Sequence, residues 1–229
     1  MKKLIRRILA LSVAILVVLS FTACKGGKTG KAGKGPLQAE NQNSVKVADT
    51  MADGVYHVGF NGDSLEKDGD DYYLEVEFYN YDKWNAEDFD KLQVGDEIKT
   101  HDTTVKIDTM IPAYEGSTGN KIGYAVNGDI DEGGYSFIRD DNGKTYRAQG
   151  YDDAFETYSV GKKKLKVSKD ITIEDKSILS GPEEELRDQE IVKYGDIEDE
   201  LHGSEFGPNN TYMTLKNNEI VKIVVEWTP

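Results

Sequence analysis

The stretch Tyr72-Tyr73-Leu74-Glu75-Val76-Glu77-Phe78-Tyr79 alternates between two kinds of side chain along its whole length. Its even-numbered positions are apolar or aromatic, and the positions between them include two glutamates. Because successive side chains of a strand point to opposite faces of a sheet, a period of two predicts a strand with one face in a core and the other in water. The stretch therefore predicts a fold built on β-sheet.

Strand signals continue on both sides of this stretch. Runs rich in β-branched and aromatic residues, bounded by turn residues, predict further strands. These runs cover residues 55–60, 103–109, 121–126, 135–138, 144–150, 163–167 and 171–173.

Helices are predicted to be short and few. Asn85 can cap a helix over 86–92, Pro182 suits the first turn of one over 183–189, and Asp196 can cap one over 197–202. None of them has the apolar stripe of a bundle helix. We therefore predict a mainly β fold, an antiparallel sandwich or open barrel with a few short helices.

Two tight hairpins are predicted from asparagine-rich turns. Asn142-Gly143 suits a two-residue type I′ turn, because both central residues of that turn have positive φ, and it would join 135–140 to 145–150. Asn217-Asn218 would likewise join 211–215 to 220–227. A two-residue turn there pairs Thr214 with Val221 and Tyr212 with Ile223.

The first 23 residues have the pattern of an export signal. Four Lys and Arg residues within the first seven positions precede an uncharged run over 8–23. That run is shorter than the roughly 20 residues that a transmembrane helix needs, so we predict a signal peptide over 1–23. Cys24, which follows it, is the only cysteine of the chain. An uncleaved anchor, or a plain signal peptide beside an incidental cysteine, is the alternative.

The segment Phe21-Thr22-Ala23-Cys24 resembles the lipobox of bacterial lipoproteins, with Phe21 where leucine is usual. As a whole the chain resembles the small lipoproteins of Gram-positive bacteria. The resemblance implies that Cys24 carries a diacylglyceryl group, which anchors the chain to the extracytoplasmic face of the cell membrane, because stable anchoring takes more than one acyl chain. With Cys24 acylated, no thiol is left for a disulfide or a cysteine nucleophile.

Residues 24–47 have the composition of a flexible tether. They are rich in Gly, Lys, Gln and Asn, and few of them can be buried. The folded part is predicted to comprise a β-rich domain over 48–180 and a smaller helix-plus-hairpin tail over 181–229, packed on the same domain, with a Ser and Gly-Pro stretch near 177–181 between them.

Charge is strongly segregated along the chain. The 28 basic residues stand against 42 acidic ones. Four of the basic residues lie in the signal peptide, and five basic and one acidic residue lie in the tether, which leaves 19 against 41 from Ala48 onward, a net charge of −22. Such a domain repels phosphate backbones, so nucleic acid is excluded as a partner.

Catalytic signatures are missing from the sequence. His57, His101 and His202 have no metal-ligand spacing, and the chain carries no H-E-x-x-H, G-x-S-x-G or P-loop motif. The sequence thus favours a surface-anchored binding or interaction module over an enzyme. An extracellular hydrolase acting on cell-wall or dietary polysaccharide is the alternative, because carboxylate pairs for acid and base roles are easily placed in so acidic a chain.

Two segments are candidate ligand sites. Tyr79, Tyr81 and Trp84 interleave aromatic rings with Asn and Asp, as a carbohydrate or wall-polymer platform would, although rings at a strand end also form the edge of a core. Asn127, Asp129 and Asp131 place three oxygen side chains at alternate positions of a glycine-containing segment, which could bind Ca²⁺, although the match to an EF-hand loop fails and a polar turn is the alternative. No other cofactor is predicted.

Overall fold

The computed structural model describes residues 35–40, 45–116, 118–140, 142–150, 154–176, 194–203 and 205–226. All of these residues belong to one compact unit that begins at Gly35. The fold is mainly β, with several sheets and short helices, as the alternating pattern predicted. The signal peptide, Cys24 and the helix expected over 183–189 lie outside the described residues.

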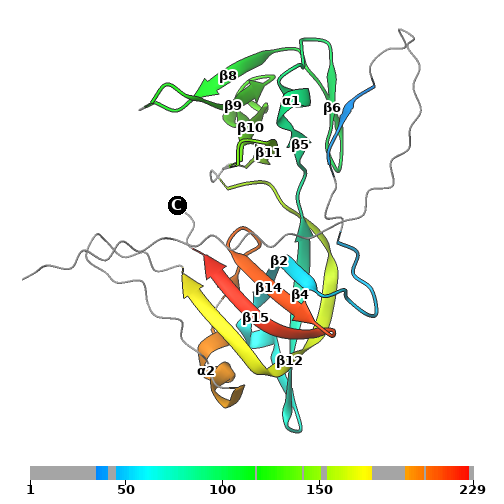
Figure 1. Ribbon diagram of the computed structural model, residues 1–229, viewed down its shortest axis with the longest axis vertical. Helices are drawn as coiled ribbons and strands as arrows, with labels where there is room; N and C mark the ends of the chain where they lie inside the picture. Colours follow the sequence, from blue (N-terminus) through cyan, green and yellow to red (C-terminus); the bar gives the residue numbers. More distant parts are fainter. Residues whose placement is uncertain are drawn as a thin grey trace, which may run out of the picture. The chain divides into compact units, whose positions relative to one another are not determined.

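Five strands form a closed ring, which we call the barrel (Figure 1). They are β2 (Gly54–Asn61), β4 (Asp71–Asn80), β12 (Tyr158–Lys176), β14 (Thr211–Lys216) and β15 (Glu219–Glu226). β2 pairs with β4, β4 with β12, β12 with β15, β15 with β14, and β14 pairs again with β2. The short strands β3 (Leu65–Asp68) and β13 (Glu205–Phe206) extend this sheet, β3 beside β4 and β13 beside β2. Because the ring is closed, the backbone N–H and C=O groups that an open sheet would leave unpaired at its edges are hydrogen-bonded to neighbouring strands.

The connectivity of the barrel identifies its topology. With its strands numbered in chain order, the ring runs 1-2-3-5-4-1, and the contact between the third and fifth strands, β12 and β15, is parallel. The short helix α2 (Ile197–Leu201) lies in the chain between the third and fourth strands. This is the connectivity of an OB-type barrel, a fold that hosts many different ligands and does not by itself fix a function.

Side chains fill the interior of the barrel. The even-numbered residues of 72–79 all point inward and are nearly inaccessible, so the predicted alternation in β4 is confirmed. Ile197 and Leu201 of α2 join the same core. Strands 163–167 and 171–173, predicted separately, are both parts of the long β12.

A second group of strands is inserted between β4 and β12, and we call residues 84–149 the insert. Its five-stranded sheet has the order β5-β11-β10-β9-β8. The members are β5 (Trp84–Asn85), β8 (Met110–Tyr114), β9 (Lys121–Val126), β10 (Tyr135–Arg139) and β11 (Thr145–Gln149). A small sheet of β6 (Glu97–Lys99) and β7 (Thr104–Lys106) accompanies it, so the strand predicted over 103–109 is only partly formed. The insert has a hydrophobic core separate from that of the barrel.

Residues near the end of the predicted tether take part in both cores. β1 (Leu37–Gln38) pairs in parallel with β6, and Leu37 packs against the core of the insert. Val45 and Val47 pack against the barrel core. The range 24–47 that we predicted as tether thus includes packed residues, because apolar side chains occur among its otherwise polar ones.

The C-terminal hairpin forms as predicted, but its predicted register is wrong beyond the first two pairs. Asn217 and Asn218 both have positive φ, as a type I′ turn requires. A bulge at Val221 of β15, opposite the step from Thr214 to Leu215, then pairs Thr214 with Lys222 and Tyr212 with Val224. The reason is the spacing of the buried residues of β15: Ile220 and Ile223 are three positions apart, and one extra residue is needed to keep both in the core.

The hairpin of β10 and β11 also forms, with a different turn from the predicted one. Among the described residues of its loop only Gly143 has a positive φ, and the Gly143 amide donates to the carbonyl of Asp140. The Asp140 carboxylate accepts hydrogen bonds from the amides of Lys144 and Thr145. These bonds support a longer loop, so a two-residue type I′ turn is not needed.

α1 (Ala86–Phe89) starts where the sequence predicted, because the Asn85 side chain accepts hydrogen bonds from the amides of Glu87 and Asp88. The helix ends at Phe89, earlier than the predicted 92. The next residue, Asp90, is held by hydrogen bonds from several side chains. Asp90 accepts hydrogen bonds from Lys121, Tyr124, Arg139 and Tyr146 of three neighbouring strands. Burial alone would raise the pKa of Asp90, but the donated bonds, led by that of Lys121, lower it to about 2. The Asp196 side chain, by contrast, makes no capping hydrogen bond to α2.

Candidate functional site

The three aromatic residues predicted as a sugar platform lie in three different environments. Trp84 is fully buried in the core of the insert, with its ring edge-on to Phe137 at 5.2 Å between centroids. Its indole nitrogen donates to the carbonyl of Lys99 over 3.3 Å. Stacking on a sugar needs a ring face open to solvent, so Trp84 cannot serve as a platform and the alternative, a core residue, holds.

Tyr79 lies on the outer side of the barrel, over Gly59 of β2. A side chain at Gly59 would come within 3.2 Å of the Tyr79 ring, so the glycine makes room for it. Tyr79 lines a shallow hollow of about 290 Å³ with Phe206 and Glu77. Burial raises the pKa of the Tyr79 hydroxyl, and the Glu77 carboxylate raises it further. This hollow is separate from the one that Tyr81 lines.

Tyr81 follows β4 and is contacted by cations. The Arg147 guanidinium carbon lies 3.8 Å from the centroid of the Tyr81 ring, and the Lys83 ammonium lies 5.0 Å from it. The other ring near Arg147 is that of Phe155, at 4.2 Å. A ring already stacked on a guanidinium is a poor platform for a sugar, but it holds cations in place.

The segment predicted for Ca²⁺ is built as a turn. The Asn127 side chain accepts hydrogen bonds from the amides of Asp108 and Thr109 and donates to the carbonyl of Lys106. Asp129 caps the 3₁₀ turn η2 (Ile130–Glu132), and Asp131 lies within that turn. Two of the three predicted oxygens therefore already accept backbone hydrogen bonds. No group of three or more His, Cys, Asp or Glu in the described part of the chain is arranged to hold a metal ion.

Tyr81 lines a polar pocket of about 330 Å³, which we call the Lys83–Lys144 pocket. The residues come from the N-terminal segment, the end of β4, β5 and the β10–β11 loop. They are Glu40, Asn80, Tyr81, Lys83, Asn85, Asn142, Lys144 and Thr145. The backbone is fixed here by hydrogen bonds, including one from the Glu40 amide to the Lys83 carbonyl over 2.5 Å.

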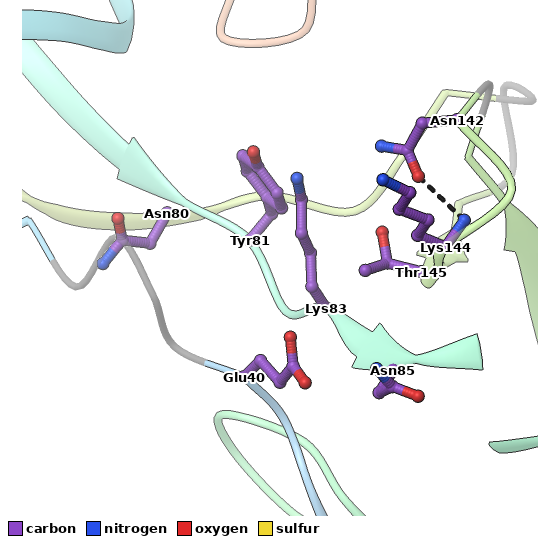
Figure 2. Close-up of a pocket in the computed structure, with 8 residues that line it drawn as sticks. All are labelled: Glu40, Asn80, Tyr81, Lys83, Asn85, Asn142, Lys144 and Thr145. Carbon is purple, nitrogen blue, oxygen red and sulfur yellow. Dashed lines mark hydrogen bonds between the residues drawn. The ribbon is translucent and has the colours of Figure 1, made fainter. Parts of the chain in front are cut away.

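Nitrogen donors converge in this pocket. Figure 2 shows the ammonium group of Lys144 and the amide nitrogen of Asn142 together on one side of the pocket, facing the side on which the Lys83 side chain extends. The Tyr81 ring lies alongside Lys83 in the same view. Two ammonium groups and an amide NH₂ are the kind of donors with which proteins bind an anion.

The amide oxygens around the pocket are already engaged. Asn142 Oδ1 accepts from the Lys144 amide over 2.8 Å. Asn85 Oδ1 caps α1, and Asn80 Oδ1 accepts from the Val45 amide over 3.2 Å. Since the oxygens accept backbone bonds, the polar groups that Asn142 and the lysines offer to a ligand are donors. Glu40 is the one carboxylate among the residues that line the pocket.

A second pocket, of about 290 Å³, has the opposite charge. His101, Asp102, Tyr135 and Glu156 are among the residues that line it. Burial raises the pKa of Glu156, and the carboxylates of Asp102 and Asp82 raise it further. His101 opposes this and lowers the pKa. An anion is disfavoured among these carboxylates, which leaves the Lys83–Lys144 pocket as the candidate site for an anionic ligand.

His101 belongs to the wall of this acidic pocket and is held from two sides. Its backbone amide donates to the buried Asp82 carboxylate over 2.7 Å, and its ring Nδ1 lies 3.3 Å from the same oxygen. The ring stacks on that of Tyr158 at 4.0 Å. The contacts join the β6–β7 turn to β12 and thereby the insert to the barrel.

Sequence reasoning found Tyr81 but missed its partners. Lys83 stands inside the predicted aromatic cluster, and its alternation with Tyr81 along 80–85 could have placed both on one side of the chain. Lys144 and Asn142 occupy a hairpin loop 60 positions away, and Arg147 lies on the strand that follows. Only the pairing of β11 with β5, which joins Thr145 to Asn85, brings these residues to Tyr81.

Comparison with protein-family models, with curated proteins and with solved structures finds no match to this chain. Within the described ranges, no helix is both long and apolar enough to cross a bilayer.

Proposed function

We propose that this protein is a membrane-anchored extracytoplasmic lipoprotein whose folded part binds an anionic saccharide, such as an acidic cell-envelope polymer, in the Lys83–Lys144 pocket. The convergence of two ammonium groups and an amide NH₂ on one polar space carries the proposal. The donors suit a carboxylate or phosphate group, and the Asn and Thr side chains around them suit the hydroxyls of a sugar.

The negative charge of the rest of the protein limits which anionic ligands this pocket can bind. Residues from Ala48 onward carry a net charge of −22, which repels polyanions over most of the surface. A single anionic group can still bind where two lysines meet, so we expect recognition of one acidic residue at a time within a polymer. Lys162, Lys164 and Lys166 do not offer such a site, because Glu77, Glu66 and Asp71 pair with them in turn.

The first test is a double substitution in the pocket. Lys83→Gln with Lys144→Gln should weaken binding of an oligogalacturonate at least tenfold, because each lost charge-assisted hydrogen bond contributes about 1.5–3 kcal/mol. Calorimetry with the soluble domain from Gly35 measures it. The paired-lysine variant Lys162→Gln with Lys164→Gln removes the same charge elsewhere and should bind like the wild type.

A neutral oligosaccharide of equal length serves as the ligand control. The proposal requires weaker binding of the neutral sugar. Equal affinity for both sugars, or equal loss in the two double variants, would show that general charge rather than this pocket binds the ligand.

The anchor rests on the lipobox resemblance, and Cys24→Ser tests it. The sulfur is both the acyl acceptor and the mark for cleavage, so the variant should remain an uncleaved and unlabelled precursor. Metabolic labelling with a radioactive fatty acid in a bacterial host gives the measurement. The same labelling in wild type and variant would sink the lipoprotein assignment.

A further inference from the structure

His57 on β2 contacts the aromatic ring that forms one wall of the Lys83–Lys144 pocket. The rings of His57 and Tyr81 meet edge to face, with centroids 5.0 Å apart. On its other side His57 contacts Tyr212 of β14, at 4.7 Å. The Tyr81 ring thus contacts His57 as well as the Lys83 ammonium and the Arg147 guanidinium.

The hydrogen bond of His57 to a backbone carbonyl determines which ring nitrogen carries the proton of the neutral form. Nδ1 lies 3.2 Å from the backbone carbonyl oxygen of Pro208, which can only accept, so Nδ1 carries the proton of the neutral ring. A second proton must therefore bind at Nε2. Protonation changes the charge of His57 without breaking its bond to Pro208.

The surroundings of His57 disfavour its protonated form. Burial lowers the pKa of His57 below its ordinary 6.5, the Pro208 carbonyl opposes this, and the cations of Arg147 and Lys83 lower the pKa further. The charged and titratable groups near it include Tyr79 of β4, Tyr81 just after β4, Lys83, Arg147 of β11 and Tyr212 of β14, and Glu226 of β15 acts on Tyr212 in turn. Burial raises the pKa of Tyr212, so that ring stays neutral across the acidic range.

We infer that an anion in the Lys83–Lys144 pocket and a proton on Nε2 of His57 stabilise each other, so that the pocket binds more tightly in mildly acidic surroundings. This inference rests on the proposed function and adds a regulation to it. The bound anion offsets the positive charge that repels a proton from His57. Coupling between two binding events is reciprocal, so protonated His57 must strengthen anion binding by the same factor.

The size of the effect follows from the distances. The ring contacts place the charges on the order of 10 Å apart, where a partly screened interaction near a protein surface changes a binding constant by about three- to tenfold. We expect oligogalacturonate to bind more tightly at pH 5 than at pH 7.5, and that factor is the upper limit of the gain, reached where His57 is fully protonated in the ligand-free protein. Its carboxylates stay ionised over this range, so the ligand itself does not titrate.

Proton NMR of the histidine rings tests the inference in the soluble domain, with the His57 resonance assigned by its loss in His57→Asn. Saturating oligogalacturonate should raise the pKa of His57. Asn can still donate to the Pro208 carbonyl, so His57→Asn should keep the pH 7.5 affinity and lose the extra tightening at pH 5. An unchanged pH dependence in this variant would assign the tightening to surface carboxylates and overturn the inference.

A second experiment measures the pKa of His57 in the absence of ligand. Lys83→Gln should raise the pKa of His57 in the ligand-free protein, whereas Lys169→Gln, further along β12 and beside Asp71, should leave it in place. An absent shift in Lys83→Gln refutes the coupling even where the anion binds. A clear shift without any anion binding would instead keep the coupling and reject the proposed ligand.

Discussion

Replacement of Trp84 by alanine is expected to destabilise the insert by about 3–5 kcal/mol, the cost of removing a large, fully buried aromatic side chain. Trp84 is inaccessible to solvent, packs edge-on to Phe137 and lies 6.2 Å from Phe89 between ring centroids. The variant also leaves the Lys99 carbonyl without the indole donor. Both losses fall on one hydrophobic core, and the residues of the barrel core are separate from it.

Hydrogen exchange measures this result strand by strand. Amides of β9, β10 and β11 should lose protection in Trp84→Ala, while those of β4 and β12 keep most of theirs. Tyr114→Ala is the matched control, because Tyr114 is an aromatic residue of the same sheet with 59% of its surface exposed. A loss of under about 1 kcal/mol in Trp84→Ala, similar to that in the control, would contradict the burial of Trp84.

Replacement of Gly62 by alanine is expected to cost about 3 kcal/mol, at the upper end of what overpacking costs. Gly62 begins the 3₁₀ turn η1 (Gly62–Ser64), which lies against the end of α2. A β-carbon at Gly62 would fall 1.6 Å from the carbonyl oxygen of Leu201, so the backbone of α2 must move away. Leu201 and Ile197 would then be drawn from the barrel core that they complete.

Urea unfolding of Gly62→Ala gives the measurement, followed by circular dichroism. Gly195→Ala is the control, because Gly195 lies in the 3₁₀ turn η3 (Tyr194–Asp196) just before α2 and a β-carbon there meets no atom within 4 Å. That variant should unfold within about 0.5 kcal/mol of the wild type. Wild-type stability in Gly62→Ala would mean that α2 does not pack on η1 as described.

The candidate site shows where sequence reasoning stops. Tyr81 was found because aromatic and amide residues cluster around it in the chain. Tyr81 is a poor platform for a sugar all the same, since the Arg147 guanidinium lies on its ring and takes the place that a sugar would need. Trp84, the residue directly after Lys83, enters a core that the chain completes only with distant residues such as Phe137 and Tyr146.

The C-terminal hairpin makes the same point about register. Asn217 and Asn218 determine the turn locally, since their positive φ values are properties of two adjacent residues. The bulge at Val221 depends on which side chains of β15 the barrel buries, and that depends on β2 and β12 on either side of the hairpin. Local patterns therefore predicted the hairpin but not the pairs beyond its first two.

The sequence by itself determined the mainly β class, the strand over 72–79, the position of both hairpins and the cap of α1, because each depends on residues that are neighbours in the chain. It also indicated the segregation of charge. Only the tertiary structure decided that β2 closes on β4 and β14, and that an insert divides the second and third strands of the barrel. Only the same long-range pairing brings Lys144 to Lys83 and His57 to Tyr81, because such contacts depend on which distant strands share an edge.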